Sequence, residues 1–301
     1  MKKSIVIINF NTQKLTDACI RSVNKHTPGC NIFVFDNSDK EPFKNSFDNV
    51  QVIDNTKGEI INFEKWLENY PTNKKSMEAT KTKGSAKHCY TVEKCMSIFS
   101  NGFLLLDSDV LVKKDISWIW DENYMYCGDV IYQPNSKIKR VLPYVCYINS
   151  KMCLENNVHY FDDNYMHGLN KTAKSERYDT GAGFYLNAAK FPHKEFKHED
   201  YIVHYKGGSW FDTYKNYEMH KKNGKREFLS DEEWLELNKE YWEDCQETAN
   251  KTQNLKESSD IVPRKHEPED KTKPVAPPRE QKTTFLRMAK GNERKIGIIQ
   301  K

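Results

Sequence analysis

Two aspartates, Asp107 and Asp109, end an apolar run in the stretch GFLLLDSDV, residues 102–110. Two carboxylates held side by side repel each other, and a bound cation or hydrogen bonds must compensate that repulsion. Mg²⁺ and Mn²⁺ characteristically take one or two carboxylates together with phosphate oxygens. The pair therefore predicts a site for a divalent ion and a phosphorylated ligand. The alternative is a strand end with two solvated aspartates.

A second stretch with suitable chemistry is YIVHYKGGSW, residues 201–210. His204 offers an imidazole nitrogen, and a neutral imidazole suits Mn²⁺ better than Mg²⁺. The glycines at 207 and 208 let backbone N–H groups approach a phosphate. The alternative for His204 is a hydrogen-bonded histidine of the core.

A third stretch, KGSAKHCYTVEKC at residues 83–95, predicts the start of a helix. Gly84 and Ser85 form the turn and N-cap, and a helix N-terminus favours phosphate. Lys87 and His88 lie in the first turn, where the phosphates or the ribose of a nucleotide would sit. The alternative for His88 is a histidine on the helix surface.

An α/β fold is expected to position these residues. The order of a buried strand at 4–8, a helix at 13–26 and a strand ending at Asp36 implies parallel strands joined by a right-handed crossover. Ligands of such sheets bind beyond the carboxyl ends of the strands. Further strands are predicted at 50–53, 102–110, 129–132 and 141–148, and 178–187 and 201–205 complete the sheet region. Helices are predicted around 63–70, at 84–99 and, from a capping box, at 230–245, and residues 151–167 are expected to loop over the site.

Composition excludes several functional classes. The 301-residue chain has a formal net charge of only +4, which is not the electrostatic footprint of a nucleic-acid binder. No apolar stretch approaches the roughly 20 residues that span a bilayer, and the start MKKSIVIINFN reads as a strand rather than a signal peptide. The eight cysteines contain no CxxC pair and are expected to be thiols of a cytoplasmic protein, with an unrecognised disulfide as the alternative.

The C-terminal part of the chain has a different composition. Residues 246–284 contain no aromatic side chain and are rich in polar residues and proline, which predicts a disordered linker after a domain at 1–245. Residues 285–301 are basic and apolar. They are a candidate contact with a protein partner or, peripherally, with an anionic membrane surface, and a loosely ordered tail is the alternative.

The stretches SIVIINFNT, LTDACIRSV, NIFVFDNSD and LLLDSDV resemble the GT-A-fold glycosyltransferases, and family 2 most of all. The resemblance spans about residues 4–210. It implies a Rossmann-like α/β fold with a mixed, mostly parallel sheet flanked by helices. It also implies a Mn²⁺- or Mg²⁺-dependent transfer of a sugar from a nucleotide-diphosphate donor, a UDP-sugar above all, to a carbohydrate, lipid-linked or protein acceptor.

The resemblance also implies roles for individual residues. Asp36 would accept a hydrogen bond from the base, Asp107 would face the ribose and the metal, and Asp109 would bind the metal. The residues expected at the nucleotide-sugar are Phe10, Asn11, Thr12, Asp36, Asn37, Ser85, Lys87, His88, Asp107, Ser108, Asp109, Gly181, Gly207 and Ser209. The expected metal ligands are Asp107, Asp109 and His204.

The stretch RYDTGAGFYLN, residues 177–187, supplies a candidate base. Its glycines allow a sugar ring to approach the backbone, and Asp179 is placed to take the proton of an acceptor hydroxyl in a direct inversion. Glu199 and Asp200 are the alternative bases, and Asp179 would then bind hydroxyls of the donor sugar. Two other functions are weighed, a nucleotidyltransferase and a non-catalytic nucleotide-sugar-binding protein. The first would carry a Gly-rich basic loop after its first strand, where this chain has NFNT.

Overall fold

The computed structural model describes residues 3–68, 82–133, 137–162, 179–205 and 229–243. The chain divides into two compact units, Met1–Gln246 and Glu247–Lys301. The second unit lies outside the described residues, and so do the predicted linker and basic tail. The fold below is that of the first unit.

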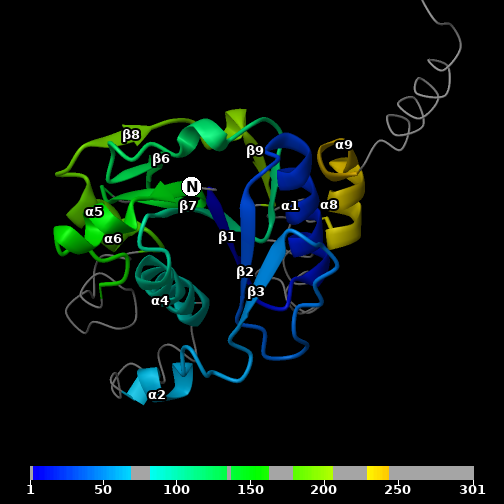
Figure 1. Ribbon diagram of the computed structural model, residues 1–301, viewed down its shortest axis with the longest axis horizontal. Coiled ribbons are helices and arrows are strands. Elements are labelled where there is room, and N and C mark those ends of the chain that lie inside the picture. Colours follow the sequence, from blue (N-terminus) through cyan, green and yellow to red (C-terminus); the bar gives the residue numbers. More distant parts are fainter. Residues whose placement is uncertain (1–2, 69–81, 134–136, 163–178, 206–228, 244–301) are drawn as a thin grey trace, which may run out of the picture. The chain divides into compact units, whose positions relative to one another are not determined.

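A seven-stranded sheet runs through the first unit in the order β3-β2-β1-β4-β7-β6-β8 (Figure 1). Its strands are β1 (Ser4–Asn9), β2 (Asn31–Asp36), β3 (Val50–Asp54), β4 (Phe103–Asp107), β6 (Tyr126–Tyr132), β7 (Lys139–Ile148) and β8 (His193–Glu195). All neighbours pair in parallel except that β7 runs antiparallel to β4 and β6. A separate antiparallel pair joins β5 (Val110–Val112) to β9 (Ile202–His204).

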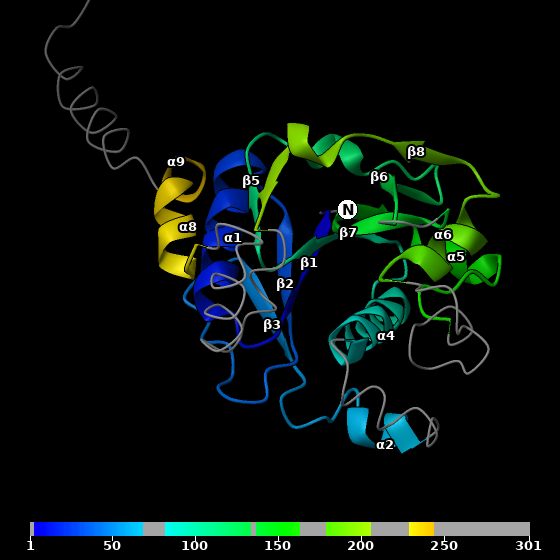
Figure 2. The same cartoon turned by 180° about the vertical axis from the view of Figure 1, so that it is seen from behind.

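Helices cover both faces of the sheet, as Figures 1 and 2 show from opposite sides. The helices of the described residues are α1 (Gln13–His26), α2 (Phe63–Glu68), α4 (Thr82–Ile98), α5 (Ser150–Glu155), α6 (Ala182–Ala188), α8 (Asp231–Leu237) and α9 (Lys239–Trp242), with 3₁₀ turns η1 (Ser117–Ile119) and η3 (His198–Asp200). The predicted mixed, mostly parallel α/β fold is therefore confirmed.

The two-residue period of the strands assigns each side chain of β1 and β4 to one face. Val6, Ile8 and Leu105 pack in the cluster that contains the apolar side of α4. Ile5, Ile7, Leu104 and Leu106 pack instead in the cluster that contains the apolar side of α1. Because both faces of these strands are covered, their sequences are continuous apolar runs.

The parallel register brings three strand ends to one edge of the sheet. Asn9 pairs with Asp36 between β1 and β2, and Ile8 pairs with Asp107 between β1 and β4. Polar residues end all three strands, so the sheet presents carboxylates and amides at its carboxyl edge. This is the edge at which a ligand was expected.

Several predicted elements were wrong. Residues 178–187 were expected in the sheet, but Ala182–Ala188 form α6, which begins after Gly181 in a left-handed conformation. Residues 151–167 were expected as a loop, yet α5 covers 150–155 because the Asn149 side chain caps it. The helix predicted at 230–245 is divided at Asn238, although the Ser230–Glu233 capping box is present. The strand predicted at 102–110 is two strands of different sheets, β4 and β5, separated by Ser108 and Asp109.

Two further features of the described residues concern membrane-spanning helices and paired cysteines. No helix there is long and apolar enough to cross a membrane. The seven cysteines that are described are buried free thiols, and Cys245 lies outside the described residues.

Candidate functional site

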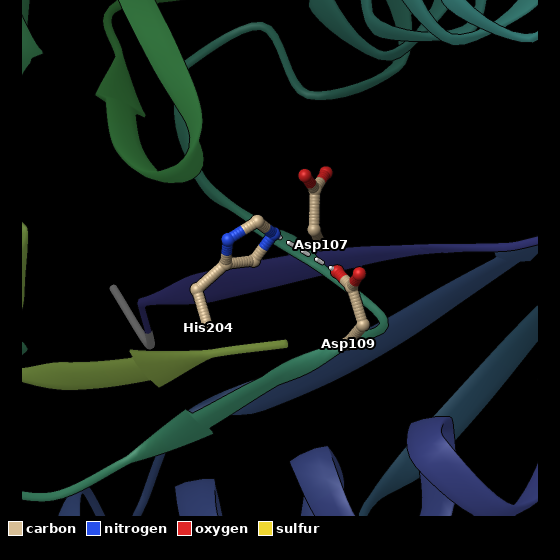
Figure 3. A group of neighbouring side chains, drawn as sticks. All are labelled: Asp107, Asp109 and His204. Carbon is tan, nitrogen blue, oxygen red and sulfur yellow. Dashed lines mark ion pairs between the residues drawn. The ribbon is translucent and has the colours of Figure 1, made fainter. Parts of the chain in front are cut away.

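Asp107, Asp109 and His204 meet at the carboxyl edge of the sheet. Asp107 ends β4, and Asp109 immediately precedes β5. The antiparallel pairing of Val110 with His204 brings the end of β9 to the same place. One ligand atom from each of the three residues lies within 4.8 Å of the others, and the side chains converge in Figure 3. Two strand ends and one β-ribbon thus assemble a group that is dispersed over almost a hundred residues of sequence.

The environment of this group favours a bound cation. Asp109 is only 2% exposed, and its Oδ1 lies 3.4 Å from His204 Nε2. Two carboxylates and one imidazole form a ligand set that suits a borderline or hard divalent ion such as Mn²⁺. The residues present therefore fit a divalent metal, as the sequence suggested.

His88 holds one carboxylate oxygen of Asp107. Its Nε2 lies 2.9 Å from Asp107 Oδ1. Burial, the largest single influence, lowers the pKa of His88, but the charge and hydrogen bond of Asp107 together with the neighbouring Cys89 outweigh it and raise the pKa to about 10. His88 thus contacts Asp107 from the first half of α4, so it belongs to the site and is not a free surface histidine.

Tyr144 of β7 lies flat against His204. The two ring centroids are 3.6 Å apart and the ring planes are inclined by 19°. Burial raises the pKa of Tyr144 to about 12; Arg140 opposes this rise, while the charges of Asp107, Asp109 and Asp179 add to it. The Tyr144 phenol thus lies in the electrostatic field of both the aspartate pair and Asp179.

Asp179 is held in place from two sides. Arg140 Nη1 donates to Asp179 Oδ2 at 2.5 Å, and the Thr180 N–H donates to Oδ1 at 2.8 Å. The Asp179 side chain is 37% exposed and is reachable from solvent. Gly181, two residues on, has a φ of +81° at the start of α6. Asp179 is therefore an ordered, accessible carboxylate beside Arg140, a residue that the sequence did not single out.

The alternative bases lie elsewhere. Glu199 and Asp200 belong to η3, and Glu199 groups with Asp129 and His198 rather than with the Asp107 group. The Glu199 side chain is 69% exposed. Glu199 thus belongs to a different acidic group, while the charge of Asp179 acts on Tyr144 together with those of Asp107 and Asp109.

The loop after β1 is tied to the aspartate pair. Asn9 Oδ1 accepts hydrogen bonds from the Thr12 and Thr16 hydroxyls, each at 2.8 Å. The Thr12 hydroxyl lies 2.9 Å from the Ser108 hydroxyl, between Asp107 and Asp109. Asn9, which is 1% exposed, was missed as a site residue although it ends the first strand. Thr12 and Ser108 thus lie side by side, as expected for residues of one pocket.

Phe10 and Asn11 form the accessible part of this edge. Phe10 is 37% exposed, and Lys87 Nζ lies 5.6 Å from its ring centroid. Asn11 has a φ of +56°, and its side-chain oxygen accepts from the N–H groups of Asp39 and Lys40. An exposed aromatic ring with a lysine above it offers a stacking surface and a positive charge for an incoming nucleotide.

Asn37 takes part in a network within the protein. Its Nδ2 donates to the Thr91 hydroxyl at 2.9 Å, and its Oδ1 accepts from Asn55 Nδ2 at 2.8 Å. Asn37 therefore links the end of β2 to α4. Of the other expected residues, Gly207 and Ser209 lie outside the described residues, as does the side chain of Ser85. The prediction of Gly84 and Ser85 as the turn and N-cap was wrong, because α4 begins earlier, at Thr82.

Asp36 is fully engaged by the protein itself. It is 1% exposed, its Oδ1 accepts from Asn9 Nδ2 and from the Ser38 hydroxyl, and its Oδ2 accepts from the Phe43 N–H at 2.7 Å. All of these hydrogen-bond donors belong to the protein itself. The geometry thus favours a structural role, in which Asp36 fixes the Asn9 side chain, over the expected hydrogen bond to a base.

An Asp36→Ala substitution is expected to destabilise the fold by about 3 kcal/mol, because it leaves several buried donors without an acceptor. The measurement is urea unfolding. Asp54→Ala is the matched control, since Asp54 pairs with Asp36 at the end of the adjacent strand but is exposed. It should cost less than about 1 kcal/mol. Equal costs for the two variants would contradict the structural role of Asp36.

Comparison with known proteins gives only distant likenesses. No family model and no curated protein matches the chain. Among solved structures, the galactosyltransferase LgtC in complex with donor and acceptor sugar analogues is 14% identical over 65% of this chain and 73% of its own, with a TM-score of 0.42. The glycosyltransferase GlyE of Streptococcus pneumoniae is 10% identical over 66% of this chain and 46% of its own, with a TM-score of 0.40. The bifunctional glycosyltransferase WbbM is 12% identical over 66% and 39%, also with a TM-score of 0.40.

These three proteins are glycosyltransferases by their descriptions, and this chain spans less than half the length of GlyE and WbbM. At such identities and TM-scores the likenesses assign no function to this chain. Membership of family 2 stays a prediction. What the protein does must follow from its own residues.

Proposed function

We propose that the chain is a metal-dependent GT-A-type glycosyltransferase that moves a sugar from a nucleotide-diphosphate donor, a UDP-sugar above all, to an acceptor hydroxyl. The observation that carries the proposal is the convergence of Asp107, Asp109 and His204 at the carboxyl edge of a mixed α/β sheet. Accessible Phe10 and Lys87 lie near the same edge. A nucleotide, a diphosphate and a divalent ion together match this combination of side chains.

Each described residue has a task in this proposal. Asp107, Asp109 and His204 hold the ion, while His88 keeps Asp107 in its place through one oxygen. A divalent ion held by these residues would neutralise the charge that develops on the leaving nucleotide diphosphate. Phe10 stacks against the base, and the Lys87 ammonium adds positive charge beside it.

Asp179 is assigned to the sugar side of the reaction. It is the carboxylate whose charge reaches the same phenol as those of Asp107 and Asp109. Arg140 and the Thr180 N–H fix its orientation, so that it takes the proton of the acceptor hydroxyl as the anomeric carbon is attacked. This role implies inversion of the anomeric configuration, which proton NMR of the product measures directly.

A screen of nucleotide-sugar hydrolysis with Mn²⁺ tests the proposal. We expect slow release of the nucleotide diphosphate from one donor, abolished by EDTA and restored by Mn²⁺. A non-catalytic binding protein would instead be stabilised against heat by UDP with Mn²⁺ without consuming any donor. A nucleotidyltransferase would release pyrophosphate from a nucleoside triphosphate and a sugar phosphate. Either of those results would overturn the transferase.

A further inference from the structure

We propose that Tyr144 is a positioning residue that sets the imidazole plane of His204 for metal binding. The inference rests on the proposed function in so far as His204 is a metal ligand. It adds a residue that neither the sequence pattern nor the metal ligand set contains. The evidence is the stacking of two rings from different sheets.

The sheet topology explains how Tyr144 reaches the site. β7 runs antiparallel to β4, and their last paired residues are Leu106 and Val145. Continuing that register by one residue places Tyr144 opposite Asp107. A reversed strand therefore delivers an aromatic ring to the edge where the parallel strands deliver their carboxyl ends. His204 arrives there from the separate β5–β9 ribbon.

The contact of His204 with Asp109 does not by itself set the imidazole plane. A 3.4 Å approach of Nε2 to Asp109 Oδ1 fixes one edge of the ring. Rotation about the terminal side-chain torsion of a histidine has a broad, roughly two-fold profile. A face-on aromatic ring at 3.6 Å and 19° blocks that rotation and selects one plane. Tyr144 therefore supplies the constraint that the carboxylate does not.

Tyr144 is itself held in place by a contact with His198. The His198 ring meets it edge-on, with centroids 5.5 Å apart and planes inclined by 68°. The His198 N–H and Nδ1 lie 3.0 and 2.7 Å from Asp129 Oδ2. Asp129 is 1% exposed and stands at an irregularity in the β6–β7 pairing. Burial would raise the pKa of Asp129, but hydrogen bonds from His198 and Lys197 outweigh it and keep the pKa below its usual range.

This arrangement makes a continuous support from the core to the metal group. An ionised Asp129 fixes His198, His198 contacts the edge of Tyr144, and Tyr144 fixes His204. Partners of metal-binding histidines typically change metal affinity by about tenfold to a hundredfold when removed. Because Tyr144 acts by stacking alone, the loss is expected at the lower end of that range.

The test is titration of the full-length protein with Mn²⁺, with the free ion followed by electron paramagnetic resonance. Tyr144→Leu should weaken Mn²⁺ binding about tenfold, while Tyr144→Phe should bind as the wild type does, because it keeps the ring. Tyr201→Leu is the matched control. Tyr201 packs against Trp118 and Phe196 three residues before His204, and its loss should lower stability without weakening Mn²⁺ binding.

A double-mutant cycle separates positioning from a general disturbance of the fold. In a His204→Ala background, Tyr144→Leu should change Mn²⁺ affinity by less than about twofold, since the ring that it orients is absent. An effect of Tyr144→Leu that persists without His204 would overturn the inference. So would wild-type Mn²⁺ affinity in Tyr144→Leu when His204→Ala alone weakens binding, and that result would leave the proposed function standing. A wild-type protein that does not bind Mn²⁺ would overturn the metal site, and the inference with it.

Discussion

An Asp109→Asn protein is expected to lose at least about a thousandfold of its Mn²⁺-dependent turnover of the donor. Asp109 is one of the two carboxylates in the ligand group, and the asparagine amide removes its charge while keeping its shape. A metal ion contributes several kcal/mol of transition-state stabilisation to the departure of a phosphorylated group, and each 1.36 kcal/mol corresponds to about a tenfold change in rate. Release of nucleotide diphosphate under saturating Mn²⁺ measures the loss.

The stability of this variant separates chemistry from folding. Removing one of two neighbouring carboxylates also removes a repulsion, so the thermal midpoint of the metal-free Asp109→Asn protein should not fall. Asp54→Asn serves as the matched control, because Asp54 is an aspartate at the end of β3 that is exposed and hydrogen-bonds to Thr56. It should retain full turnover. Wild-type turnover in Asp109→Asn would rule out the proposed metal chemistry.

The largest expected effect on stability is that of Gly181→Ala, which should lower the free energy of unfolding by about 4 kcal/mol. An added Cβ would lie 2.0 Å from the Val141 carbonyl oxygen, a backbone atom of a central strand. The left-handed backbone, with a φ of +81°, adds a strain of about 1–2 kcal/mol for any residue with a side chain. Displacing β7 or α6 to relieve the clash adds about 1–3 kcal/mol more. Urea unfolding followed by circular dichroism measures the change.

Gly29→Ala is a close control for this prediction. Gly29 has almost the same backbone conformation, with a φ of +86°, but an added Cβ meets nothing within 4 Å. Its substitution should therefore cost only the strain of about 1–2 kcal/mol. If both variants lose the same stability, the close approach of Gly181 to Val141 is not what fixes the start of α6.

The sequence predicted the part of the site that depends on local pattern. GFLLLDSDV shows its buried strand and its carboxylates together, and His204 stands before two glycines in a stretch with few other candidates. The parallel pairing of β1 with β2 and β4 follows from the apolar runs and the short turns. These features can be predicted from the pattern of apolar residues in a strand and from the rule that ligands bind at the carboxyl ends of strands.

The sequence did not predict contacts that depend on the reversed strand. Tyr144 and Arg140 reach the site because β7 runs antiparallel to its neighbours. The residues VLPYVCYI do not indicate whether this strand is parallel or antiparallel to them. Asp36 illustrates a different limit of the sequence. Its position at a strand end suggested a ligand contact, but its burial and its partners within the protein depend on Ser38 and Phe43 in the following loop.

The helix α6 was missed for a related reason. The glycines in DTGAGFYLN suggested an extended, ligand-facing backbone, while Phe184 and Ala188 are one helical turn apart and both are buried. A helix of seven residues has only two turns, so its apolar periodicity is too short to predict a helix in a stretch that contains two glycines. Packing of Phe184 on Tyr160, with ring centroids 5.0 Å apart, decides the conformation.

The most direct test is anomalous diffraction at the manganese edge from crystals grown with Mn²⁺ and UDP. We expect one strong peak within about 2.0–2.3 Å of carboxylate oxygens of Asp107 and Asp109 and of a ring nitrogen of His204, with the diphosphate of UDP completing the coordination. A peak bound to other residues, or UDP located away from the carboxyl edge of the sheet, would contradict the assignment of this group as the metal–nucleotide site.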